Sequence, residues 1–105
     1  MKAQNIFDAL PADLDKEVFE QLVASPNVRI ERIVSIGHTS PEKGWYDQAQ
    51  NEWVIVLQGE AVIAFEGDEE IKMQPGSYLN IPAHKKHRVT WTAKETETIW
   101  VGVFY

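Results

Sequence analysis

The chain has 105 residues, an apolar fraction of 44% and a formal charge of −6, which fits one domain with one hydrophobic core. The absence of cysteine excludes disulfides, thiolate metal ligands and a cysteine nucleophile. The negative charge argues against a nucleic-acid partner, and no apolar run approaches the roughly 18 residues of a membrane span. Because no signal-like segment follows Met1, the sequence predicts a cytoplasmic protein with neither nucleic-acid nor membrane partners.

Residues 1–27 are expected to form an N-terminal helical arm. Asp13 follows Pro11 and has the character of a helix N-cap. Apolar residues then recur every four positions and form one stripe: Leu14, Val18 and Leu22. The pattern ends at Pro26. The sequence therefore predicts a short amphipathic helix of about three turns that docks on the rest of the chain.

Residues 28–105 show the pattern of short β-strands separated by turns. After a first strand that begins at Val28, strands are expected at 53–57, 61–65, 71–73, 78–81, 87–92 and 98–105. A loop is predicted at 38–44, a hairpin tip at 66–69 and a turn at Pro75-Gly76. No helix-length pattern separates these strands, so βαβ crossovers are excluded and a sandwich or barrel is predicted.

Two groups of polar and glycine residues flank the apolar strands. They are Gly44, Glu52 and Gly59 in the first group, and Gly76, Pro82 and His87 in the second. Their spacing resembles the two paired motifs of the cupin superfamily, in which a histidine pair, a glutamate and a further histidine jointly hold a transition metal. The resemblance covers residues 44–91. It implies an all-β, double-stranded β-helix (jelly-roll) barrel over residues 28–105, preceded here by the short helix.

The chain departs from the family pattern at the histidine pair. Two registers are open for the places of these histidines. They are held either by Tyr46 and Gln48 or by Trp45 and Asp47, depending on whether three or four residues separate the pair from the glutamate. The choice decides which side chain faces the barrel interior.

The resemblance implies that Glu52 and His87 are metal ligands. Asp47 or Gln48 is a candidate third ligand, and His84, which replaces a family glycine, is a fourth if its loop folds inward. Carboxylate, amide and imidazole donors suit Fe, Mn, Ni and Zn alike, so the identity of the divalent transition metal stays open.

Two interpretations of the Glu52–His87 pair compete. In one, the pair holds a metal with open positions for a substrate or O₂. In the other, it is a buried hydrogen-bonded pair in a vestigial pocket. We prefer the metal, because an unpaired carboxylate inside the barrel would be costly without a cation. In an enzyme, Tyr46 and His84 are candidates for proton transfer or for hydrogen bonding to the substrate.

Three functional hypotheses follow, because cupin folds host many functions. The first is a metal-dependent oxygenase, isomerase or decarboxylase that acts on a small molecule. The second is a non-catalytic cupin that binds or senses a small molecule with a degenerate metal site, and the third is a barrel kept for assembly. The basic cluster at 85–88 is either a solvated loop or an electropositive rim that attracts an anionic ligand.

Strand alternation predicts which residues share the interior with the polar pair. Beside Glu52 these are Val54 and Val56, and on the strand that begins at His87 they are Val89 and Trp91. The opposite face of the Glu52 strand is apolar as well: Trp53, Ile55 and Leu57. A second copy of the chain in a homodimer is the preferred cover for that face, and the N-terminal helix is the alternative.

Overall fold

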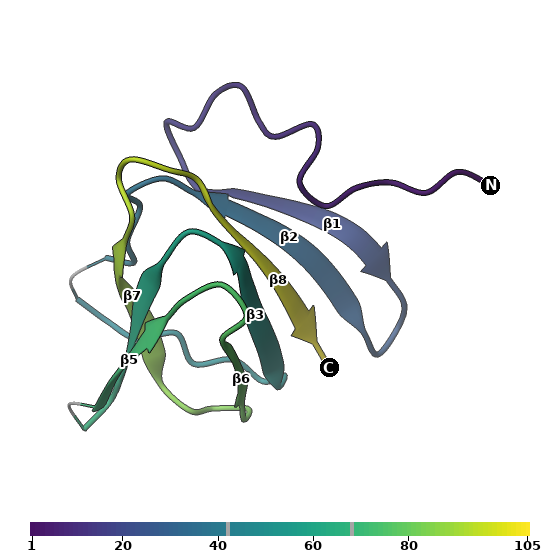
Figure 1. Cartoon of the computed structure of the whole chain (residues 1–105). Coiled ribbons are helices and arrows are strands. Elements are labelled where there is room, and N and C mark those ends of the chain that lie inside the picture. The colour runs from purple at the N-terminus through teal and green to yellow at the C-terminus, as the bar shows by residue number, and fades with distance from the viewer. Residues whose placement is uncertain (42, 68) are drawn as a thin grey trace.

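The computed structural model describes residues 1–41, 43–67 and 69–105, so Glu42 of the predicted loop and Asp68 of the predicted hairpin tip lie outside it. The described chain forms eight strands in two antiparallel sheets that face each other (Figure 1). The strands are β1 (Val18–Ala24), β2 (Arg29–Ser35), β3 (Glu52–Gln58), β4 (Ala61–Phe65), β5 (Glu69–Met73), β6 (Tyr78–Ile81), β7 (His87–Thr92) and β8 (Thr98–Phe104). The larger sheet has the order β1-β2-β8-β3-β6, and the smaller has the order β5-β4-β7. The predicted all-β barrel is confirmed.

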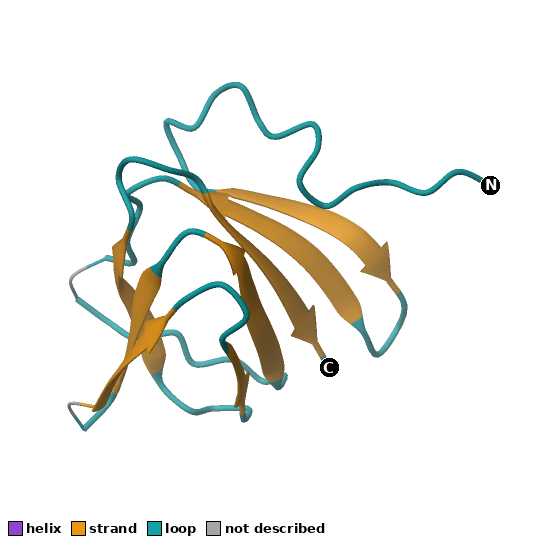
Figure 2. Cartoon of the chain, in the orientation of Figure 1, coloured by secondary structure: helices purple, strands orange, loops and turns teal. Residues whose placement is uncertain are grey.

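The predicted N-terminal helix is wrong. The described residues form strands and loops only (Figure 2), and they contain no helix that could cross a bilayer. Asp13 accepts a hydrogen bond from the backbone N–H of Asp15 at 3.0 Å, which makes an Asx turn instead of a helix cap. The chain then stays extended, because β1 pairs with β2 from Val18 to Ala24. A four-residue repeat fits a strand as well as a helix, since four is twice the strand period.

The side chain of Arg32, on β2, binds the N-terminal segment. Arg32 is only 5% exposed. The guanidinium group donates to three backbone carbonyl groups, those of Ile6 at 3.0 Å, Asp8 at 2.7 Å and Ala9 at 3.1 Å. It also makes three hydrogen bonds to the Glu20 carboxylate, at 2.7, 2.9 and 3.2 Å. A buried charge with this many partners is fully compensated, so the segment before β1 has a fixed position.

The hydrophobic core lies between the two sheets. Its buried members are Ile33, Val54, Val56, Ala61, Ile63, Phe65, Met73, Ile81 and Trp100. The interior positions predicted on β3 are therefore confirmed. Gly59, between β3 and β4, has a φ of 84°, and a Cβ atom there would lie 2.6 Å from the Cα atom of Thr98. Only glycine fits such a position, and the close approach joins the β3–β4 turn to β8.

Candidate functional site: an acid–imidazole pair in the barrel

A pocket of about 130 Å³ lies between the sheets. Its apolar and aromatic wall consists of Phe19, Ile33, Tyr46, Val54, Ile63, Ile81, Val89, Trp100 and Phe104. Its other lining side chains are Glu17, Ser40, Gln48, Glu52 and His87. Both sheets contribute, so the strands bring together residues that are far apart in the sequence. A largely apolar cavity with a few polar groups is the usual form of a ligand pocket.

Glu52 and His87 meet inside this pocket. Each is the first residue of its strand, β3 in the larger sheet and β7 in the smaller. The Nε2 atom of His87 lies 3.4 Å from Oε1 of Glu52, and the two side chains are 6% and 13% exposed. The side-chain amide of Gln48 donates to the same carboxylate oxygen at 2.8 Å. The Glu52 carboxylate therefore has two polar partners and is not isolated.

The surroundings of His87 orient its ring and raise its pKa. Its Nδ1–H donates to the backbone carbonyl of Lys85 at 2.8 Å, which leaves Nε2 directed at Glu52. Burial lowers the pKa of His87, but the hydrogen bonds to Glu52 and Lys85 and the negative charge of Glu52 outweigh it. The pKa of His87 is therefore raised above its ordinary value of 6.5. The contacts to Glu52 and Lys85 thus stabilise the protonated form of His87.

The segment from Tyr46 to Gln48 lies alongside the start of β7. The backbone N–H of Tyr46 donates to the carbonyl of His87 at 2.8 Å, and that of His87 donates to the carbonyl of Tyr46 at 3.2 Å. The N–H of His84 donates to the carbonyl of Gln48 at 2.7 Å. Because side chains alternate along an extended segment, Tyr46 and Gln48 line the pocket and Asp47 does not. These contacts settle the register that the sequence left open.

Asp47 and His84, two of the predicted site residues, pair with each other instead. The Nδ1–H of His84 donates to Oδ1 of Asp47 at 2.7 Å, and these side chains are 69% and 42% exposed. Neither residue is part of the pocket lining. His84 has a φ of 64°, a strained conformation for a residue other than glycine. The structure thus brings Gln48, Glu52 and His87 together and leaves this second pair near the surface.

Glu17 is a pocket residue that the sequence did not single out. It directly precedes β1 and lines the cavity together with Phe19. Burial raises the pKa of the Glu17 carboxyl group, and the electrostatic effect of His38 opposes this shift only in part. The sequence analysis assigned Glu17 to a helix and so did not consider it as a pocket residue. In an extended chain, Glu17 and Phe19 lie on the same face, and this alternation was the signal that could have placed both in the pocket.

One interior position predicted on β7 is wrong. Val89 lines the pocket, but Trp91 is 40% exposed. The pairing of β4 with β7 shifts between Val62 and Ile63, so that Thr90 is an extra residue on β7 and the alternation changes phase. The buried indole in the pocket wall is that of Trp100, whose Nε1–H donates to the hydroxyl group of Ser35 at 3.2 Å.

The lysine and arginine side chains of residues 85–88 contact residues that do not line the pocket. Nζ of Lys85 lies 5.2 Å from the centre of the Phe65 ring, and Nζ of Lys86 lies 3.8 Å from the Glu66 carboxylate. The guanidinium carbon of Arg88 lies 4.7 Å from the centre of the Trp45 ring. No lysine or arginine is among the described residues that line the pocket.

The donor set in the pocket falls short of that of a tightly held catalytic metal. Such sites usually have three protein donors and one open position. Among the described residues, no three His, Asp or Glu side chains converge. Glu52 and His87 supply two strong donors, and the Gln48 amide group turns its NH₂ toward Glu52. These residues do not match a resident catalytic metal.

The fold and the pocket together define a small antiparallel β-barrel protein with a polar cluster in its interior. A model of the cupin domain matches residues 33–104, so the chain belongs to the cupin family. No curated protein matches the chain.

Three solved structures show the same fold. A protein from Ralstonia eutropha JMP134, provisionally named a mannose-6-phosphate isomerase, is 42% identical with a TM-score of 0.93, covering 99% of this chain and 97% of that one. An RmlC-like cupin from Desulfovibrio desulfuricans is 24% identical with a TM-score of 0.76, covering 99% and 96%. An RmlC-like cupin from Methanocaldococcus jannaschii, described as a double-stranded β-helix, is 20% identical with a TM-score of 0.70, covering 90% and 84%.

Proposed function

We propose that this cupin binds a small organic molecule in the barrel pocket and that Glu52 and His87 make the polar contacts to it. The observation that carries the proposal is the convergence of Gln48, Glu52 and His87 on one place in a largely apolar cavity. The cavity volume of about 130 Å³ is close to that of an engineered cavity of about 150 Å³ that holds benzene. The ligand, or the part of it inside the barrel, is therefore about the size of benzene.

The lining favours a neutral or cationic ligand over the anionic one considered from the sequence. Two carboxyl side chains and one imidazole line the pocket, and the basic cluster lies against Phe65, Glu66 and Trp45. The same lining argues against a sugar phosphate as the ligand, although the Ralstonia relative is provisionally named a mannose-6-phosphate isomerase. A hexose phosphate is much larger than benzene, and proteins usually bind phosphate with arginine, lysine or a helix N-terminus.

A fragment titration tests the binding proposal. Neutral fragments of about the size of benzene are titrated into ¹⁵N-labelled protein, and the indole Nε1–H signal of Trp100 reports entry into the pocket. Glu52→Gln keeps the shape of the side chain but removes its charge, so polar fragments should bind roughly tenfold more weakly. Asp47→Asn is the matched control and should leave binding unchanged. Fragments that never perturb Trp100 would overturn the proposal.

A weakly held divalent ion (Fe, Mn, Ni or Zn) is the second candidate. One observation favours it: a metal-bound histidine usually donates its other ring N–H to a carbonyl or carboxylate, as Nδ1 of His87 does to Lys85. Glu52 and Nε2 of His87 would hold the ion, with the oxygen of Gln48 as a third donor after rotation of the amide.

Elemental analysis separates the two candidates. The protein is purified without added metal and without chelator, next to His87→Gln. About one metal ion per chain, lost in the variant, would support the metal-dependent hypothesis. A metal-free wild-type protein that still binds fragments would support metal-independent binding.

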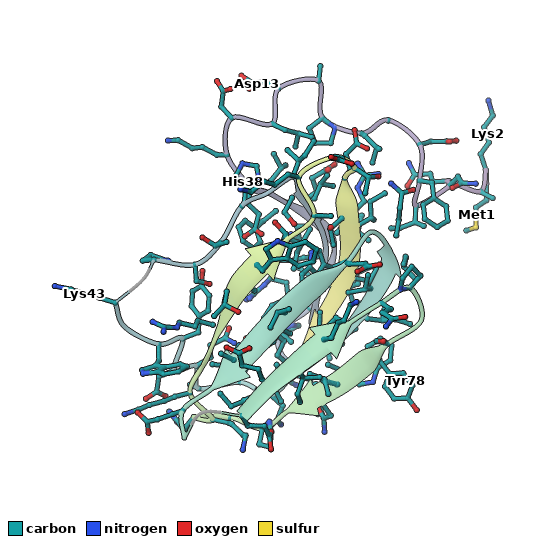
Figure 3. The ribbon with its side chains drawn as sticks, turned by 60° about the vertical axis from the view of Figure 1, so that its left-hand side comes forward. Met1, Lys2, Asp13, His38, Lys43 and Tyr78 are labelled. Atoms are coloured by element: carbon teal, nitrogen blue, oxygen red, sulfur yellow. The ribbon has the colours of Figure 1, made fainter. Side chains whose placement is uncertain are left out.

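We also propose that the outer face of the larger sheet pairs two copies of the chain. Partly exposed apolar side chains cover this face on β3 and β8: Trp53, Ile55, Leu57, Val101 and Val103. Tyr78 is 64% exposed on β6, projects from the molecule in Figure 3, and lies 5.6 Å from Trp53 between ring centres. Light scattering should give twice the chain mass, and Ile55→Glu should give a monomer. A cytoplasmic location remains a prediction from the sequence.

A further inference from the structure

Glu17 is an acid in the pocket wall, and no lysine or arginine among the described residues lines the pocket with it. Glu52 and His87 line the same cavity. Burial raises the pKa of the Glu17 carboxyl group, and the electrostatic effect of His38 lowers it by less. Figure 3 shows His38 below the turn that carries Asp13, and Nδ1 of His38 accepts the backbone N–H of Ile36 at 2.9 Å. Burial of a carboxylate is costly unless a positive charge accompanies it, and the imidazole among the described lining residues, that of His87, lies beside Glu52.

The position of Glu17 is fixed from both sides. On one side, Val18 pairs with Val34 at the start of β1. On the other, Arg32 holds the carbonyl groups of Ile6, Asp8 and Ala9, which anchors the segment that leads to Glu17 (Figure 1). The acid is therefore part of a built wall and not the end of a loose tail.

Aromatic rings complete this wall. Phe19, Tyr46 and Trp100 line the same cavity, and Tyr46 lies 5.8 Å from His87 between ring centres. A fourth aromatic side chain, Phe104, already has the guanidinium carbon of Arg29 at 4.3 Å from its ring centre. Aromatic faces attract cations, most strongly where water is excluded; Trp100 is buried, whereas Phe19 and Tyr46 are about half-exposed. An acid next to aromatic rings is the combination that recognises ammonium groups.

We infer that the pocket selects a small organic cation, an alkylammonium or quaternary ammonium group, held between the Glu17 carboxylate and the aromatic wall. The charge of Glu52 is already shared with His87 and Gln48, so we assign the selection of the ligand's charge to Glu17, while Glu52 and His87 keep the polar contacts to the ligand. Glu17 is the specificity-determining residue for the charge of the ligand. This inference rests on the proposed function, that the pocket binds a small molecule, and adds the chemical class of that molecule.

Three compounds of nearly the same shape test the inference. Tetramethylammonium is positive, tert-butanol is neutral and pivalate is negative. Each is titrated into ¹⁵N-labelled wild-type protein, Glu17→Gln and the exposed control Glu95→Gln, with the Trp100 indole signal as the readout. Wild-type protein should bind tetramethylammonium at least tenfold more tightly than tert-butanol and pivalate. Glu17→Gln should lose at least tenfold in affinity for the cation and keep its affinity for tert-butanol, and Glu95→Gln should match the wild type.

The outcomes distinguish the inference from the proposed function. If tert-butanol or pivalate binds wild-type protein as tightly as the cation, the inference fails while small-molecule binding stands. If Glu17→Gln folds and keeps full affinity for tetramethylammonium, Glu17 does not select the charge. If none of the three compounds, and none of the neutral fragments, perturbs Trp100, both proposals fail. The comparison on wild-type protein decides the matter even if the variant does not fold.

Discussion

Two histidine–carboxylate pairs lie close together in the chain but in opposite surroundings. The Glu52–His87 pair has side chains that are 13% and 6% exposed and atoms 3.4 Å apart, whereas the Asp47–His84 pair has side chains that are 42% and 69% exposed and atoms 2.7 Å apart. The shorter contact belongs to the exposed pair, where water screens the interaction. The longer contact belongs to the buried pair, where the loss of one partner leaves a desolvated polar group. Burial, more than distance, decides which pair matters.

The largest expected effect comes from removing one histidine of each pair. His87→Ala should lower the free energy of unfolding by about 3–5 kcal/mol, because the Glu52 carboxylate loses a buried partner. His84→Ala should lower it by less than about 1 kcal/mol, as is typical of exposed pairs. Urea denaturation at neutral pH measures both. Equal losses for the two variants would contradict the contrast between the pairs.

The pH dependence of the inner pair gives the next effect. The pKa of His87 is raised above 6.5 in the folded protein, so its stabilising contribution is full below that value and is lost as the pH rises through the raised pKa. Glu52→Gln should therefore cost about 1–3 kcal/mol at mildly acidic pH, and the difference from wild type should shrink with increasing pH. Denaturation over a pH series, together with an NMR titration of His87, measures this. A difference that grows with pH would have the wrong sign.

Glu17 is a third acid to set beside the two pairs, because it is partly buried in the pocket wall. Its pKa is raised above 4.5 in the folded protein, so folding loses stability as the pH rises from that value through the raised pKa. Glu17→Gln should then be more stable than wild type at neutral and alkaline pH, and the advantage should vanish below pH 4.5. Thermal melts across this range test the expectation. A variant that is less stable at alkaline pH would show that Glu17 has a full ionic partner.

The smallest expected effect is the different salt dependence of the coupling energies of the two pairs. The coupling energy between Asp47 and His84 should be below about 0.5 kcal/mol and should disappear near 1 M salt, where the screening length is about 3 Å. The coupling between Glu52 and His87 should persist, since solvent ions have little access to it. Double-mutant cycles at low and high salt measure both. Loss of the inner coupling in salt would mean that the pocket interior is well hydrated.

The barrel was predictable because each of its strands carries its own signal. Alternation on β3 placed Val54 and Val56 inside together with Glu52, and the positive φ angles of Gly67 and Gly76 fall at the predicted turns. Such signals are local in the sequence. They do not depend on a partner elsewhere in the chain, so they can be read without knowledge of the tertiary structure.

The features that the sequence did not predict each depend on a contact with a distant part of the chain. The four-residue repeat of Leu14, Val18 and Leu22 is compatible with a helix, but pairing with β2 makes its second half, from Val18 on, a strand. The choice between Asp47 and Gln48 depends on hydrogen bonds between residues 46–48 and 84–87. Glu17 became a pocket residue only through that same β1 pairing and the anchoring by Arg32.

The interior pair should contact the ligand, and the exposed pair should not. Crystals soaked with benzene-sized polar fragments provide the test. We expect fragment density inside the barrel, within hydrogen-bonding distance of Glu52 or His87. Fragments found only beside Asp47 and His84 or elsewhere on the surface, with the barrel interior closed by its own side chains, would contradict it.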